Sequence, residues 1–126
     1  MPKQVPSLSN PPRPLAPYSV ATEANGFVFI SGQVALDRNG GPTPADVLDQ
    51  TRLVMDNIGS ILTDLGLGYG DIVKTTVFLT DIDDFGRMNE VYGSYFEGEP
   101  PARSALQVSA LPRSEFKIEI EAVVAR

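Results

Sequence analysis

Apolar and polar residues are arranged along this chain in two different spacings. Alternation at every second position marks residues 18–36, 72–80, 102–111 and 116–125, which predicts strands, the first stretch holding two. Between residues 43 and 66 the spacing changes to steps of four and three, which predicts a helix with one buried face. A second helix follows residue 84, with Phe85, Met88, Tyr92, Tyr95 and Phe96 on one face. The predicted order is ββαβαββ, without an internal repeat.

Turn and cap residues separate these elements. Asn25-Gly26 lies between β-branched and aromatic residues and predicts a tight hairpin. Thr43 is the expected N-cap of the first helix, with Pro44 at its first position and Gly66 at its end. Asp83 or Asp84 is expected to cap the second helix; capping explains this acidic group, which includes Asp81, better than a bound cation.

Residues 1–17 differ from the rest of the chain, because they contain six of its eleven prolines. Proline removes backbone donors and fixes φ, so this density is not compatible with a helix or a sheet ladder. We expect an extended, partly mobile arm, whose role as a functional arm or as a frayed terminus stays open. The full chain has 126 residues, and its remainder, 18–126, is expected to form a single domain.

Alternation assigns the strand residues to two sheet faces. The face expected under the helices is uniformly apolar: Val28, Ile30, Val77, Leu79, Leu106, Val108, Ile118, Ile120, Ala122 and Val124. The other face mixes aromatic, small polar and charged residues: Phe27, Phe29, Ser31, Gln33, Thr76, Phe78, Arg103, Ala105, Gln107, Glu119, Glu121 and Val123. A solvated antiparallel face carries fewer phenylalanines. A closed homo-oligomer with the sheets facing inward would cover this surface, and a monomer with an adhesive face is the alternative.

Composition narrows the chemistry. The sequence has no cysteine and no histidine, which excludes disulfides, thiol nucleophiles, Cys/His zinc sites and a Ser-His-Asp triad. The net charge of −6 argues against nucleic-acid binding. No apolar run approaches the ~20 residues of a membrane helix, and no secretory signal is visible at the N-terminus. We therefore expect a cytoplasmic protein with no membrane partner.

Three charged residues remain as candidates for chemistry. Glu119 and Glu121 lie two residues apart on one strand, so their mutual repulsion should raise the pKa of one of them. A carboxylic acid with a raised pKa can act as general acid or base. Arg103 can hold a carboxylate through two hydrogen bonds. Spacing alone leaves the alternative open that the glutamates are solvated and that Arg103 is their structural partner.

The same residues carry a resemblance to a known family. The segments "APYS", "FISGQV", "GDIVKTTVFLTDIDDF", "NEVYGSYF", "PPARSALQV" and "KIEIEAVV" resemble the YjgF family of reactive-intermediate deaminases (RidA) from about Tyr18 to Val124. The resemblance implies an α+β, chorismate-mutase-like fold: a mixed sheet with two helices on one face, assembled as a homotrimeric barrel. It also implies three sites in clefts between subunits. Family members hydrolyse 2-imino acids and their enamine tautomers, such as 2-aminoacrylate, to 2-oxo acids and ammonia.

The resemblance also assigns roles to individual residues. Arg103 matches the carboxylate-binding arginine, and Glu119 the glutamate that positions or activates water. Positions that line the pocket are matched by Tyr18, Ser31, Gly32 and Asn89. Ala105 departs from the family pattern, in which many members have cysteine after "PARS"; this removes a modifiable thiol and changes the pocket.

The implied enzyme is a 2-iminobutanoate/2-iminopropanoate deaminase that needs no metal or organic cofactor. The rival is a member of the same family that binds small 2-oxo acids without catalysis, or acts as a chaperone-like regulator. Some members have also been linked to RNA cleavage, which the acidic balance of this chain disfavours. Retention of both Arg103 and Glu119 favours the enzyme.

Overall fold

A computed structural model of the chain describes residues 2–9, 14 and 16–126. Its strands are β1 (Ala21–Ala24), β2 (Phe27–Gln33), β3 (Ile72–Leu79), β4 (Ala102–Gln107) and β5 (Ile118–Ala125). Its helices are α1 (Val47–Asp64) and α2 (Phe85–Gly93), with 3-10 turns η1 (Tyr69–Asp71) before β3 and η2 (Ile82–Asp84) before α2. The predicted order ββαβαββ is confirmed.

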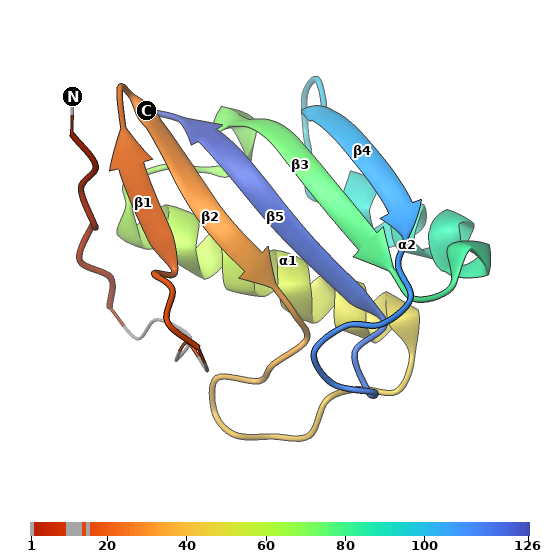
Figure 1. Cartoon of the computed structure of the whole chain (residues 1–126). Helices are drawn as coiled ribbons and strands as arrows, with labels where there is room; N and C mark the ends of the chain where they lie inside the picture. Colours follow the sequence, from red (N-terminus) through yellow and green to blue (C-terminus); the bar gives the residue numbers. More distant parts are fainter. Residues whose placement is uncertain (1, 10–13, 15) are drawn as a thin grey trace.

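The five strands form one sheet in the order β1-β2-β5-β3-β4. Neighbouring strands are antiparallel except β3 and β4, which run parallel, so the sheet is mixed. Both helices lie behind the sheet on the same face, and the front face carries no helix (Figure 1). The fold is therefore the expected α+β arrangement.

The β1–β2 hairpin turns where it was predicted. Asn25 and Gly26 both have positive φ, 53° and 80°. A turn with two positive φ values matches the twist of an antiparallel pair, and Asn-Gly tolerates that backbone.

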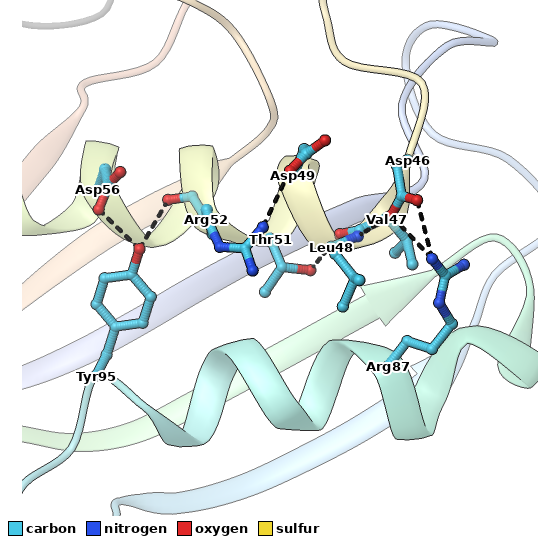
Figure 2. Close-up of polar contacts among 9 residues, drawn as sticks. All are labelled: Asp46, Val47, Leu48, Asp49, Thr51, Arg52, Asp56, Arg87 and Tyr95. Carbon is cyan, nitrogen blue, oxygen red and sulfur yellow. Dashed lines mark hydrogen bonds and ion pairs between the residues drawn. The ribbon is translucent and has the colours of Figure 1, made fainter.

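The start of α1 corrects one prediction. The N-cap is Asp46, whose carboxylate accepts a hydrogen bond from the Leu48 N–H at 2.7 Å. Thr43 lies three residues earlier, and its hydroxyl donates to the Ala35 carbonyl at 2.8 Å. A carboxylate at the first turn also interacts favourably with the helix dipole. Asp46 further pairs with Arg87 of α2 at 2.9 Å, which ties the two helices together (Figure 2).

The predicted end of α1 is confirmed, and the predicted cap of α2 is confirmed in part. Gly66 follows the last residues of α1 with φ of 73°, the left-handed backbone expected of a glycine stop. Asp84 occupies the N-cap of α2, but its side chain makes no capping bond. The carboxylate that caps this region is Asp81, which accepts from the Asp83 N–H at 2.9 Å at the start of η2.

The far end of the α1–α2 pair is joined by Tyr95, which lies after α2 ends. Its hydroxyl donates to Asp56 of α1 at 2.8 Å and lies 3.3 Å from the Arg52 carbonyl (Figure 2). Burial and the neighbouring Asp56 raise the pKa of Tyr95, so its hydroxyl stays protonated. Polar contacts thus fix α2 against α1 at both ends.

The core lies between the helices and the sheet. Eight of the ten residues predicted for the covered face are buried: Val28, Ile30, Val77, Leu79, Ile118, Ile120, Ala122 and Val124. Leu106 and Val108 are the exceptions; Leu106 is 41% exposed, and Val108 lies beyond β4 and is half-buried. The parallel register pairs Arg103 with Thr75 and Ala105 with Val77, both of which are buried. In β4 it is therefore Arg103, Ala105 and Gln107 that share the face of the helices, the reverse of the prediction.

The N-terminal arm makes more contact with the domain than its proline content predicts. Gln4 forms an isolated bridge with Glu23, its N–H and carbonyl bonding the backbone of β1 at 2.9 and 2.8 Å. Ser9 bonds the carboxylate of Asp64 through both its N–H and its hydroxyl. Within the described residues, the arm is held at the outer edge of β1 and at the end of α1.

Candidate active site

The helix-free face of the sheet exposes large apolar side chains. Phe27 and Phe29 are 43% and 46% exposed, and Leu106 lies on the same face. Glu119 and Glu121 of β5 face the same way, because they pair with Phe78 and Thr76 across β3. The predicted mixture of phenylalanines and carboxylates on this face is confirmed.

A β-bulge in β2 shapes this face next to Glu119. Ile30 pairs with Ala122 and Gln33 pairs with Ile120, so β2 has one more residue than β5 over the same length. Such an extra residue redirects the side chains that follow it. Gln33 is consequently turned to the core side and buried, and its amide donates to the Ser31 carbonyl at 2.9 Å. The expectation that Gln33 shares the open face is wrong for this reason.

The bulge brings the backbone of Gly32 against the side chain of Glu119. A Cβ atom on Gly32 would overlap the carboxylate of Glu119. Any other residue at this position would push the Glu119 side chain away, so the missing Cβ of Gly32 provides the space that the carboxylate occupies.

Ser31 connects the bulge to Tyr18. Its hydroxyl donates to the Ser19 carbonyl at 2.7 Å, and its N–H donates to the Val20 carbonyl at 2.9 Å. These bonds hold the segment that precedes β1 and leave Tyr18 exposed at the mouth of a cavity.

That cavity, of about 380 Å³, brings together three of the predicted site residues, Tyr18, Gly32 and Glu119. Its other walls are Ala16, Val20, Gln33, Val34, Leu36, Asn57, Pro112, Arg113 and Phe116. We call Tyr18, Ser31, Gly32 and Glu119 the glutamate cluster.

Glu119 is the candidate acid or base of this cluster. Burial raises its pKa, and the like charge of Glu121 raises it further. The predicted direction is confirmed, although desolvation outranks the neighbouring carboxylate as its cause. A half-buried carboxyl with a raised pKa can exchange a proton with a reacting group closer to neutral pH.

Arg103 lies on the opposite face of the sheet, against α2. Its Nη1 donates to Oδ1 of Asn89 at 2.7 Å, and its guanidinium lies over the rings of Tyr92 and Phe85 at 4.9 and 5.4 Å. The Tyr92 hydroxyl in turn shares a 2.6 Å hydrogen bond with Thr75 of β3. We call Asn89, Arg103 and Ala105 the arginine cluster. Within it, Ala105 packs against the hydrophobic core.

The two clusters are thus separated within one chain, which corrects the expectation that Arg103, Glu119 and Glu121 share one face. Alternation gave the wrong side for β4 because Leu106, the one large hydrophobic residue of "ARSALQ", lies on the open face. The side was decided by the aromatic rings of α2, which accept a guanidinium by cation–π contact. The contribution of Tyr92 and Phe85 was missed, since helical spacing marked both as ordinary packing residues.

The cavity walls formed by Arg113, Phe116 and Leu36 were also missed. Arg113 lies in a loop, where periodicity gives no signal, and alternation placed Leu36 and Phe116 at the ends of strands without pointing to a cavity. The one available indication was that "PRSE" immediately precedes the strand that carries Glu119.

Comparison with known proteins settles the family. Residues 8–126 match the family described as Endoribonuclease L-PSP, and solved neighbours include proteins of the Rid family and the YjgF gene product of Escherichia coli. The chain belongs to the YjgF/RidA family. A RutC family protein of Pyrococcus horikoshii is 46% identical over 96% of both chains. The mouse 2-iminobutanoate/2-iminopropanoate deaminase is 43% identical over 96% of this chain and 90% of its own.

Solved structures of RidA-family proteins show the same fold. A Rid protein of Yersinia pestis superposes with a TM-score of 0.92 at 38% identity, covering 99% of this chain and 100% of its own. E. coli TdcF, solved with bound serine, gives a TM-score of 0.90 at 40% identity over 98% of both chains. Among the described residues, no helix is long and apolar enough to cross a membrane.

Proposed function

We propose that this RidA-family chain is an enzyme that hydrolyses 2-imino acids and their enamine tautomers to 2-oxo acids and ammonia. The proposal is carried by two charged groups with defined surroundings. Arg103 is oriented by Asn89 and two aromatic rings, and Glu119 is a half-buried glutamate whose pKa is raised. The names of the mouse and rat relatives as 2-iminobutanoate/2-iminopropanoate deaminases support the substrate class.

The separation of the two clusters supports a site shared between subunits. A heterologous contact that repeats around a three-fold axis would place the arginine cluster of one chain opposite the glutamate cluster of the next. The same assembly would cover Phe27 and Phe29, whose exposure is unusual for a monomer. We therefore propose a homotrimer with three such sites.

The proposed reaction needs only binding, a water molecule and one proton carrier. Arg103 holds the α-carboxylate of the substrate in a charge-assisted pair. Backbone donors near Ser31 and Gly32 would help from the other side, although the Ser31 N–H itself already donates to the Val20 carbonyl. TdcF, a relative whose structure holds serine, has bound a molecule with the same carboxylate and neighbouring nitrogen.

Proton transfer then falls to Glu119. Its carboxylate accepts a proton from water as the oxygen bonds to the imine carbon, which gives a carbinolamine. The carboxyl returns that proton to the nitrogen. The carboxylate then removes the hydroxyl proton of the carbinolamine as the C–N bond breaks, which gives the 2-oxo acid and ammonia, and ammonia takes up the proton from Glu119 to leave as ammonium. Because a protonated imine carbon is already electrophilic, general-base assistance of ~10²–10⁴-fold is enough for a useful enzyme.

A coupled assay tests the proposal. Threonine dehydratase supplies the enamine, and the appearance of the 2-oxo acid is timed with and without the protein. We expect the wild type to accelerate that step, and Arg103→Ala and Glu119→Gln to abolish the acceleration, while Lys3→Ala in the exposed arm leaves it unchanged. A non-catalytic binder would bind 2-oxobutanoate without altering the rate, and full activity of Arg103→Ala would overturn its assignment.

A further inference from the structure

The cavity beside Glu119 extends past the groups needed to hydrolyse a small imine. Its volume of about 380 Å³ falls in the range of roughly 300–1,000 Å³ typical of small-molecule sites. Its distal wall is the loop between β4 and β5, through Pro112, Arg113 and Phe116. If the imine carbon lies at Glu119, a longer substrate side chain can extend through the cavity toward this wall.

The loop is fixed by a buried glutamine of α1. The Gln50 side chain is fully buried, and its amide donates to the Glu115 and Pro44 carbonyls at 2.8 and 2.7 Å. Its carbonyl accepts from the Lys117 N–H at 2.8 Å. Because two of these bonds hold Glu115 and Lys117, the residues on either side of Phe116, the backbone of the distal wall has a defined position.

Arg113 is the positively charged group on this wall. Its guanidinium lies 5.5 Å from the centre of the Phe116 ring, whose own side chain is buried. The carboxylate paired with it, on Glu115, is 3.9 Å away, too long for a hydrogen bond, and both side chains are a little less than half exposed. The planar guanidinium therefore has donors to offer to an anion in the cavity.

We propose that Arg113 binds a second carboxylate, so that the site favours 2-imino acids whose side chain ends in an acid. The inference deepens the proposed function and rests on it. The α-carboxylate lies on Arg103 of the neighbouring subunit, the imine carbon faces Glu119, and the side-chain carboxylate reaches Arg113. Without Arg113, the remaining ionisable groups lining this cavity, Glu119 and Tyr18, would offer a second carboxylate no positive charge.

Competing imines test this selectivity. Amino-acid oxidases acting on aspartate and on alanine supply an acidic and a neutral imine in situ, and semicarbazide traps whatever the assembled protein leaves unhydrolysed. Arg113→Ala should lower kcat/KM for the aspartate-derived imine by about 10- to 100-fold, the value of a charge-assisted hydrogen bond. The rate for the alanine-derived imine should change less than about twofold, because its methyl group has no second carboxylate for Arg113 to bind.

Two further variants sharpen the result. Arg113→Lys keeps the charge and should retain part of the preference. Lys117→Ala removes an equal charge from the same loop, outside the cavity, and should leave kcat/KM unchanged for both imines. An unchanged ratio between the two imines in Arg113→Ala, whether both rates fall or neither does, would overturn the proposal.

Calorimetry separates this proposal from the proposed function. The wild type should bind 2-oxoglutarate more tightly than 2-oxobutanoate, and Arg113→Ala should remove that difference. If the wild type hydrolyses no imine but shows this binding difference, the catalytic proposal fails and the role of Arg113 stands. If it hydrolyses imines but binds both oxo acids equally, the role of Arg113 fails alone.

Discussion

The glutamate cluster and the arginine cluster are built by different means. The position of Glu119 depends on the backbone: a bulge in β2 and a glycine without a side chain. The position of Arg103 depends on side chains, since Asn89, Tyr92 and Phe85 of one helix surround a residue on an edge strand. A substitution at the glycine should therefore displace Glu119 at once, whereas each substitution around Arg103 should remove only one of the contacts that orient it.

The largest expected effect comes from mixing variants of the two clusters. Arg103→Ala and Glu119→Gln should each be inactive alone, because every site lacks one group. Co-expressed chains that assemble at random would pair an intact arginine cluster with an intact glutamate cluster in about a quarter of the sites. Activity should therefore return to about a quarter of the wild-type value per site, and no recovery would place both groups in the same chain.

The next effect tests the backbone of the glutamate cluster. Gly32→Ala should lower kcat by about 10- to 100-fold, because the added methyl displaces Glu119 and a 1 Å misplacement costs that much. Gly86→Ala is the matched control, since a Cβ at Gly86 meets no neighbouring atom. Equal losses in both variants, measured by steady-state kinetics, would contradict the close-approach argument.

The arginine cluster should respond in KM before kcat. Asn89→Ala removes the 2.7 Å acceptor and should raise KM by about 10-fold, as expected of one hydrogen bond to a charged group. Tyr92→Phe keeps the ring under Arg103 but leaves the buried Thr75 hydroxyl without its partner. That variant should keep KM while losing about 1–3 kcal/mol of stability in urea unfolding. A KM increase in Tyr92→Phe would assign the hydroxyl itself to binding.

Glu119 should reduce stability where it is ionised. Its folded-state pKa is raised by burial and by Glu121, so its ionisation disfavours the folded state as pH rises through that pKa. Glu119→Gln should therefore be more heat-stable than the wild type above the raised pKa. The difference should vanish at pH values below the ordinary carboxyl pKa, where both proteins are uncharged at this position. Melting temperatures across the pH range would show the reverse sign if the carboxylate were stabilised by a partner.

The smallest effect concerns Glu121. Its charge is the second cause of the raised pKa of Glu119, after burial. Glu121→Gln should shift the acidic limb of the pH profile of kcat/KM to lower pH without abolishing activity. Glu90→Gln, an exposed change on α2, serves as the control and should leave that limb in place.

Much of this architecture could be predicted because the periodicity was strong. The strands "FVFISGQ", "IVKTTVFL" and "IEIEAVVA" each place aliphatic residues at alternate positions, on the buried face, and Asn25-Gly26 specifies its own turn. Prediction failed where local pattern was weak or where a tertiary contact decided. The side chosen by Arg103 depends on rings that arrive from α2, and the cap of α1 depends on where the preceding loop is held. The bulge that moved Gln33 off the open face leaves no signal in the alternation itself.

The bridge between Gln4 and Glu23 affects how the edge of the sheet at β1 can pair with other molecules. The outer side of β1 is a sheet edge, and exposed edge backbone is a template on which strands of other molecules can add. Gln4 occupies part of that edge through two backbone hydrogen bonds, and the prolines on either side of it cannot extend the ladder. The proline-rich N-terminal arm therefore ends the sheet on that side and hinders the addition of strands from other molecules.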